Sequence, residues 1–451
     1  MDVAACFQLL LLHDVCAGVY FDSRRNHRHR LLRGNLDCPG RRTKAKITAH
    51  AQHHTNVGVL AFFKYWNFLN DNLTDLLGLF HSENPVPYLQ ILLPIGLSFH
   101  TFQAMSYTIE VYRGNQKPER HFGIYALYVM FFPQLVAGPI ERPQNMLHQF
   151  HEKHNFSYVN AVAGLRMMLW GLFKKIVIAD LLAGYSDKVF ATPSDYHGQE
   201  FIVAAVFFAF QVYCDFSGYS DIAVGSARVM GFNLIQNFRM PFFSRSLTDL
   251  WRRWHISLST WFFDYLYSPL VNRFRNWGLA GIALALLITF FLSGLWHGAA
   301  WTFVVFGLLH SIALIYEVVT RKARKKLSKR IPSALYNAGC TLLTFGFFAY
   351  TMVIFRANNL KDSWYITKSM FRFDLSKLGI NVNDDKVSLV SSFALIILLL
   401  VVERQLLSRP IEVMLGQVRT LPRWSLYVVM VWAILFSAAA HFSNQFIYFQ
   451  F

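Results

Sequence analysis

Long apolar runs separated by short polar or basic stretches dominate the chain from residue 57 onward. Because lipid offers no partners for backbone N–H and C=O groups, we expect each run to be helical. Pro94, Gly96, Pro133 and Gly218 interrupt several runs, and such breaks need protein or a polar cavity to satisfy the freed backbone groups. The pattern predicts an all-α, polytopic integral membrane protein of about nine to ten hydrophobic helices, several broken or re-entrant. The runs are Val57–Leu69, Tyr88–Ile109, Phe122–Ile140, Ala161–Ala183, Phe201–Val229, Leu279–Phe291, Ala299–Tyr316, Leu335–Phe355, Val387–Val402 and Trp424–His441.

Composition agrees with a membrane protein, since 54% of residues are hydrophobic, only 15% are charged and the mean hydropathy is +0.30. The net charge is +17, from 43 Lys and Arg against 26 Asp and Glu. These charges lie in blocks between apolar runs, as the positive-inside rule predicts, so they do not indicate nucleic-acid binding. Seven of the ten residues of Arg321–Arg330 are basic, and we expect this block to be a cytoplasmic loop attracted to anionic lipid.

The N-terminal part, residues 1–55, differs from the rest of the chain. It is basic and rich in histidine, and it contains no apolar run of spanning length. We expect it to be a disordered or mis-started segment, followed by one membrane domain over residues 56–451 with its core motifs in 57–317. Three histidines at positions 50, 53 and 54 lack acidic or Cys partners, and the five cysteines show no CxxC spacing. The sequence therefore predicts neither a metal site nor a disulfide framework.

His297 lies in the motif Gly294-Leu-Trp-His-Gly298, inside an apolar stretch of about 38 residues, Leu279–Tyr316, that contains no Lys, Arg, Asp or Glu. A stretch of this length corresponds to two membrane spans. His297 is near its midpoint, where the chain must turn. A titratable group is costly at membrane depth and is usually functional there. The position favours a base at the joint of a helical hairpin, with a packing role as the alternative.

The segment from Ser246 to Leu270 has apolar residues at helical spacing, with arginine and aspartate mostly on the opposite face. Ser246 is a suitable N-cap, and Asp249 falls in the first turn. A helix with indoles on one side and arginines on the other is typical of the membrane interface. We expect one interfacial amphipathic helix here, with His255 at the edge of its apolar face. Taken alone, His255 fits a packing or interfacial histidine.

Asp215 and Asp221 interrupt an otherwise apolar run, so both are expected to face a polar interior. A structural hydrogen-bond network with neighbouring Ser and Tyr side chains is the simplest interpretation. Lys174 and Lys175 are expected to snorkel toward the cytoplasmic face. The chain has no P-loop, no GxGxxG, no HExxH and no GxSxG motif, which counts against an NTPase, a dinucleotide-dependent enzyme and a serine hydrolase.

Taken together, these motifs resemble the membrane-bound O-acyltransferase family. The similarity is to its bacterial branch of alginate and peptidoglycan O-acetyltransferases and teichoic acid D-alanine transferases. It covers about 260 residues in the family's order and continues weakly beyond them. The matching stretches are Leu60–Phe68, Leu93–Gln103, Phe132–Pro143, Gly171–Asp180, Asp215–Asp221, Trp251–Ser259 and Gly294–Gly298.

The resemblance implies helices around a central funnel, with His297 and His255 as the two catalytic histidines. The family resemblance implies that no cofactor is permanently bound. It also implies that the acyl donor is acetyl-CoA or another acyl thioester on the cytoplasmic side. The acceptor is a hydroxyl of an exported polysaccharide such as alginate, or of a periplasmic SGNH-type acetyltransferase partner. The location is the bacterial cytoplasmic (inner) membrane, with lipid as the surroundings and no nucleic acid as a partner.

Transfer of an acyl group to a hydroxyl requires a base, and a neutral buried imidazole suits this role. We therefore expect His297 to be the general base, and His255 to orient a substrate or stabilise the tetrahedral intermediate. The alternative from another class is a transporter or flippase for a cell-envelope precursor. It explains broken helices and buried aspartates equally well. It does not explain the Trp-His-Gly and Trp-Arg-Arg-Trp-His motifs, and the sequence has no inverted repeat.

Overall fold

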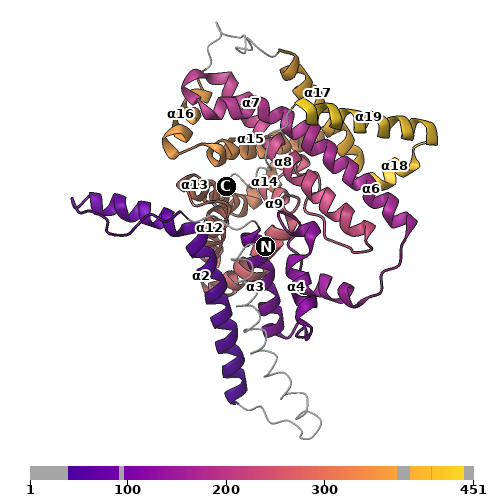
Figure 1. Ribbon diagram of the computed structural model, residues 1–451. Helices are drawn as coiled ribbons and strands as arrows, with labels where there is room; N and C mark the ends of the chain where they lie inside the picture. The colour runs from indigo at the N-terminus through magenta and orange to yellow at the C-terminus, as the bar shows by residue number, and fades with distance from the viewer. Residues whose placement is uncertain (1–38, 91–95, 373–385, 408, 441–451) are drawn as a thin grey trace. The chain divides into compact units, whose positions relative to one another are not determined.

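The computed structural model of the chain describes residues 39–90, 96–372, 386–407 and 409–440 (Figure 1). Every regular element within these ranges is a helix, which confirms the all-α prediction. The chain divides into two compact units, residues 1–155 and 156–451, and each is described below by itself. The predicted division at residue 55 stays a prediction. Residues 1–38 of that N-terminal segment lie outside the described ranges.

The first unit contains the long helix α2 (Pro39–Gly78) and two shorter helices, α3 (Leu97–Arg113) and α4 (Phe122–Met130). The break expected at the second apolar run is present, because α3 begins only after Gly96, which has a positive φ of 76°. A side chain could not replace this glycine, since a Cβ there would lie 2.5 Å from the carbonyl oxygen of Leu135. The third run is also broken, into α4 and the short helix η1 (Phe132–Gln134).

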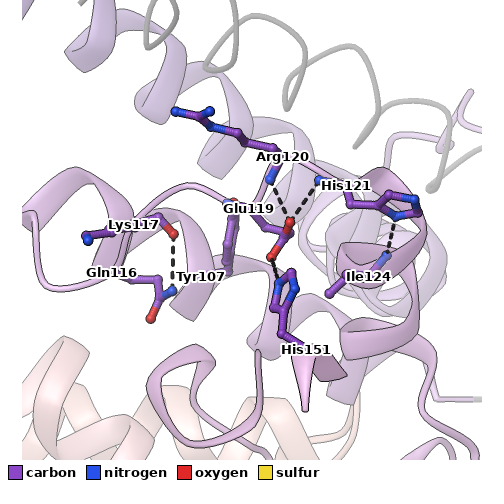
Figure 2. A network of polar contacts seen from close by, with 8 residues as sticks. All are labelled: Tyr107, Gln116, Lys117, Glu119, Arg120, His121, Ile124 and His151. Atoms are coloured by element: carbon purple, nitrogen blue, oxygen red, sulfur yellow. Dashed lines mark hydrogen bonds and ion pairs between the residues drawn. The ribbon is translucent and has the colours of Figure 1, made fainter. Parts of the chain in front are cut away.

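A polar cluster closes the turn between α3 and α4 (Figure 2). The carboxylate of Glu119 accepts hydrogen bonds from the backbone N–H groups of Arg120 and His121, at 2.7 and 2.8 Å. Its other oxygen lies 2.7 Å from Nε2 of His151. The backbone N–H of Glu119 donates to the hydroxyl of Tyr107 on α3. Glu119, through its carboxylate and its backbone N–H, therefore ties together three segments of the first unit.

The second unit holds the helices that are long and apolar enough to cross a membrane. Within the described residues there are six candidate spans, which confirms a polytopic membrane protein. Of the remaining predicted segments, Val57–Leu69 lies within the long helix α2, and the others form shorter or broken helices. The spans belong to helices α8 (Gly198–Val229), α12 (Gly278–His297), α13 (Trp301–Val319), α15 (Ser333–Arg356), α17 (Lys386–Leu406) and α19 (Thr420–Ala440).

Four glycines bring α6 (Tyr158–Leu172) and α8 into close contact, and the two helices run side by side in Figure 1. A Cβ on Gly164 would lie 2.4 Å from the carbonyl oxygen of Gly225, and one on Gly171 would lie 2.5 Å from that of Gly218. The glycines are seven residues apart on each helix, so both pairs lie along one contact face. Without side chains at these positions the two backbones can approach closely, as is common between membrane helices.

Candidate functional site

His297 is the last residue of α12, and the short link Gly298–Ala300 leads into α13. The structure therefore confirms that this histidine lies at the joint of a helical hairpin. The hairpin is tightly closed, because Gly294 of α12 and Gly307 of α13 each face backbone of the other helix at a distance that excludes a Cβ. Gly298 lies against the ring of Phe303 in the same way. The glycines around His297 are thus needed for close approach.

Aromatic rings surround the half-buried imidazole of His297. Its ring centroid lies 5.0 Å from that of Trp296, 5.3 Å from that of Phe355 on α15 and 6.0 Å from that of Phe306 on α13. All three contacts are close to edge-to-face. These edge-to-face contacts fix the orientation of the ring at the hairpin joint.

The structure corrects the prediction of one continuous interfacial helix after Ser246. It contains α9 (Leu247–Trp251), α10 (Ile256–Phe262) and the π-helical turn η6 (Phe263–Tyr267). The predicted cap at the start is confirmed, since Oγ of Ser246 accepts a hydrogen bond from the backbone N–H of Asp249. Periodicity could not reveal the break, because apolar spacing continues across it.

The break between α9 and α10 is held by tertiary hydrogen bonds and by His255. His255 adopts a left-handed backbone conformation with φ of 43°. The carbonyl oxygen of Asn237 accepts from the N–H of Ile256 at 2.9 Å, and its side-chain oxygen accepts from the N–H of Ser257 at 3.2 Å. Asn237 comes from the loop after α8, and its two oxygens accept from the first N–H groups of α10, which have no partner within that helix.

His255 is buried, with 1% of its surface exposed, rather than at the edge of an apolar face as predicted from the sequence. Its ring lies edge-on to Phe216 of α8, at 4.6 Å between centroids, and 6.0 Å from Trp296. Because Trp296 also contacts His297, one indole touches both histidines. Burial holds the pKa of His255 well below its ordinary value of 6.5, with a smaller contribution from repulsion by His297 when that ring is protonated. The structure thus brings the two predicted site residues together in a setting that keeps His255 neutral.

A cavity of about 520 Å³ lies between the α9–η6 segment and the α12–α13 hairpin, and neither His255 nor His297 is among its lining residues. Its volume is within the usual size range of small-molecule sites. One wall comes from the α9–η6 segment and includes Trp251, Ile256 and Tyr267. The other wall comes from α12 and α13. Ser293, one helical turn before His297, lines the cavity, and so does Ile256, directly after His255. The lining is mostly apolar, so the cavity can hold a flexible, weakly polar chain.

The two aspartates in the middle of α8 form ion pairs with lysines of η3 (Phe173–Ala179). Nζ of Lys174 lies 2.8 Å from a carboxylate oxygen of Asp221 and donates to the hydroxyl of Ser217 at 2.9 Å. Nζ of Lys175 lies 2.7 Å from Asp215. The predicted polar interior around the aspartates is confirmed, but the expected snorkelling of both lysines is wrong. Lys174 is 3% exposed, because two carboxylates on the neighbouring helix offset the cost of burying the ammonium groups.

Sequence reasoning missed His310, which is fully buried in the middle of α13. Its only sequence signal was a second histidine in the same uncharged stretch as His297. Within the residues whose side chains are described, no group of three His, Cys, Asp or Glu side chains could hold a metal ion. The histidines at positions 50, 53 and 54 lie outside that part of the chain.

Comparisons with known proteins point to one family. A model of the membrane-bound O-acyltransferase family matches residues 121–356, which include His255 and His297. A probable alginate O-acetylase, AlgI, of Pseudomonas aeruginosa is 38% identical over 329 residues, covering 71% of this chain and 59% of that protein. The peptidoglycan O-acetyltransferase of Helicobacter pylori is 36% identical over 342 residues, covering 70% of this chain and 63% of that protein. The teichoic acid D-alanyltransferase of Bacillus subtilis is 26% identical over 303 residues, covering 65% of this chain and 73% of that protein. The chain spans 59% to 63% of the length of the first two relatives.

Proposed function

This chain belongs to the membrane-bound O-acyltransferase family, and on that basis we propose that it carries out O-acetylation of an exported polysaccharide such as alginate. The acyl group comes from a thioester donor, acetyl-CoA or another acyl thioester, on the cytoplasmic side of the bacterial inner membrane. The observation that carries the proposal is the pairing of His297 and His255 across Trp296. A cavity of suitable size reaches Ser293, one helical turn before His297.

In the proposed mechanism, His297 is the general base. The acceptor oxygen forms a bond to the carbonyl carbon of the thioester while its proton passes to the imidazole. The C–S bond then breaks, and its electron pair leaves with the sulfur. His297 returns the proton to the thiolate, so the products are an ester and a free thiol. The aromatic contacts of His297 support this role because they fix the orientation of the imidazole at the hairpin joint.

His255 assists as a neutral imidazole, the form that burial favours. Its lowered pKa keeps the ring neutral, so one nitrogen can donate a hydrogen bond while the other accepts. A neutral imidazole that donates can stabilise the negative charge developing on the carbonyl oxygen. We assign to His255 this stabilisation of the tetrahedral intermediate, together with orientation of the thioester.

The cavity supports entry of the donor from the cytoplasmic side. It extends from Val318, near the end of α13, to Ser293, one turn before His297. The basic helix α14 (Arg321–Ser328) follows α13 directly, and the positive-inside rule places it in the cytoplasm. A thioester arm in this cavity would thus approach the histidines from the cytoplasm. The acceptor, a polysaccharide or an SGNH-type acetyltransferase partner, would approach from the periplasm.

The test is His297→Ala, with His297→Gln and wild type in parallel, in membranes supplied with labelled acetyl-CoA. Loss of a general base lowers rates by about 10²–10⁴-fold, so we expect both variants to lose most thioester consumption. Protein amount and insertion into the membrane are measured on the same samples. Undiminished consumption in a well-inserted His297→Ala protein would remove His297 from the mechanism. A wild-type protein that consumes no thioester would favour a transporter or flippase instead.

A further inference from the structure

A third histidine, His310, lies between the two elements that carry the proposed catalytic pair. It is fully buried, and aromatic rings of α12, α13 and α15 pack around it. Its Nδ1 lies 3.3 Å from the indole nitrogen of Trp251, and its Nε2 lies 3.0 Å from the hydroxyl of Thr351. Both ring nitrogens are therefore engaged.

The direction of these hydrogen bonds follows from the donors available. An indole N–H can only donate, so Nδ1 of His310 accepts from Trp251. In the neutral ring the hydrogen is then on Nε2, which donates to the hydroxyl of Thr351. That hydroxyl in turn donates to the carbonyl oxygen of Phe348 at 2.8 Å. A protonated His310 would place two donors face to face at Trp251, so this chain of bonds exists only with a neutral ring.

His310 contacts both parts of the proposed site. Trp251 ends α9, four residues before His255, and is one of the residues that line the cavity. On the other side, Phe306 packs against His310 at 4.6 Å and against His297 at 6.0 Å between ring centroids. The buried side chain of His310 thus contacts Trp251, which precedes the turn at His255, and Phe306, which packs against His297.

We propose that His310 is a positioning residue, which holds Trp251, and with it the turn carrying His255, against the α12–α13 hairpin carrying His297. The proposal rests on the acyl transfer proposed above. His310 does not touch substrate, because aromatic rings enclose it and both nitrogens are occupied within the protein. Its effect is on geometry, and a displacement of about 1 Å at a reacting group can cost about 100-fold in rate.

The experiment compares substitutions that retain different parts of the imidazole. His310→Phe keeps the aromatic packing and removes both hydrogen bonds. His310→Asn places an amide oxygen near the position of Nδ1, so it can still accept from Trp251. Trp251→Phe removes the donor of the bond to His310, and the double variant of His310→Phe and Trp251→Phe completes a double-mutant cycle. Ile312→Leu, at a neighbouring position of α13 that is 57% exposed, is the matched control.

The readout is the consumption of labelled acetyl-CoA by membranes, as kcat and KM for the thioester per amount of inserted protein. We expect His310→Phe to lower kcat by about 10- to 100-fold with KM changed less than about twofold. We expect His310→Asn to recover most of the loss and Ile312→Leu to match wild type. The double variant should be no slower than the slower single variant, because each single variant already removes the hydrogen bond between His310 and Trp251.

Multiplicative losses in the double variant, a His310→Asn protein as slow as His310→Phe, or full activity of His310→Phe would each overturn the positioning role. In all three cases the wild type still consumes acetyl-CoA, so only this assignment falls. A wild type that consumes none overturns the proposed acyl transfer, and the role of His310 in it falls at the same time.

Discussion

The ion pair between Lys174 and Asp221 allows a quantitative test of how the second unit is held together. The side chain of Lys174 is 4% exposed, whereas that of Asp221 is 29% exposed. Removing either partner leaves a charge in a region of low polarity, which typically costs about 3–5 kcal/mol. Replacing both by apolar residues removes the attraction together with the desolvation cost, and is often close to neutral.

The difference in exposure predicts an order for the single variants. Lys174→Met leaves a carboxylate that water can still partly reach, so we expect a loss of about 3 kcal/mol. Asp221→Leu removes the carboxylate and leaves the more deeply buried ammonium of Lys174, which still donates to the hydroxyl of Ser217. We therefore expect a larger loss of stability, about 5 kcal/mol. The double variant should lose only about 1–2 kcal/mol, far less than the sum of the single losses.

The assay is the free energy of unfolding of purified protein, titrated with a denaturing detergent in a fixed amount of mild detergent. Lys188→Met, which removes an exposed lysine from α7 (Asp180–Ala191), is the control and should change stability by less than about 0.5 kcal/mol. A double variant as unstable as the sum of the single variants would refute the reasoning. So would a Lys174→Met protein that unfolds like wild type.

Three further predictions concern other parts of the chain. Gly218→Ala should cost about 1–3 kcal/mol in an unfolding titration, because its Cβ would lie 2.7 Å from a carbonyl oxygen, whereas Gly184→Ala, with nothing within 4 Å, should not destabilise the protein. Burial raises the pKa of Glu119, but the hydrogen bonds from the N–H of His121, the ring of His151 and the N–H of Arg120 together outweigh burial. The net effect is a pKa below the ordinary value. The ionised carboxylate therefore stabilises the folded state fully at pH values above 4.5, and this contribution is lost as the pH falls through the lowered pKa of Glu119. We expect the melting temperature of Glu119→Gln to depend less on pH than that of wild type between pH 4.5 and that lowered pKa. Ser293→Leu, which fills the cavity, should raise KM for the thioester by about tenfold at similar kcat, and an unchanged KM would exclude the cavity as the donor site.

The two proposed catalytic histidines differ in how far the sequence could place them. His297 stood out because an imidazole inside a long uncharged stretch is unusual, and its position at a hairpin joint followed from the length of that stretch. His255 was assigned to the edge of a helix that does not exist as one piece. Its burial depends on Asn237, which lies 18 positions earlier in the chain and which no periodicity connects to it.

Local information in the sequence determined the helical class, the long apolar runs, the breaks near Gly96 and Pro133, and the hairpin around His297. These features depend on the transfer of contiguous residues into lipid and on backbone hydrogen bonds within one segment, which hydropathy and residue type report directly. The break expected at Gly218 is wrong, because α8 runs unbroken through this glycine, which serves close packing against α6. Only the tertiary structure decided which charges pair, why Lys174 is buried, where the helix at His255 breaks and that His310 joins Trp251 to Thr351. Each of these depends on two groups far apart in the chain, and the free energy of burying one depends on the other. A pattern read along one segment does not contain that partner.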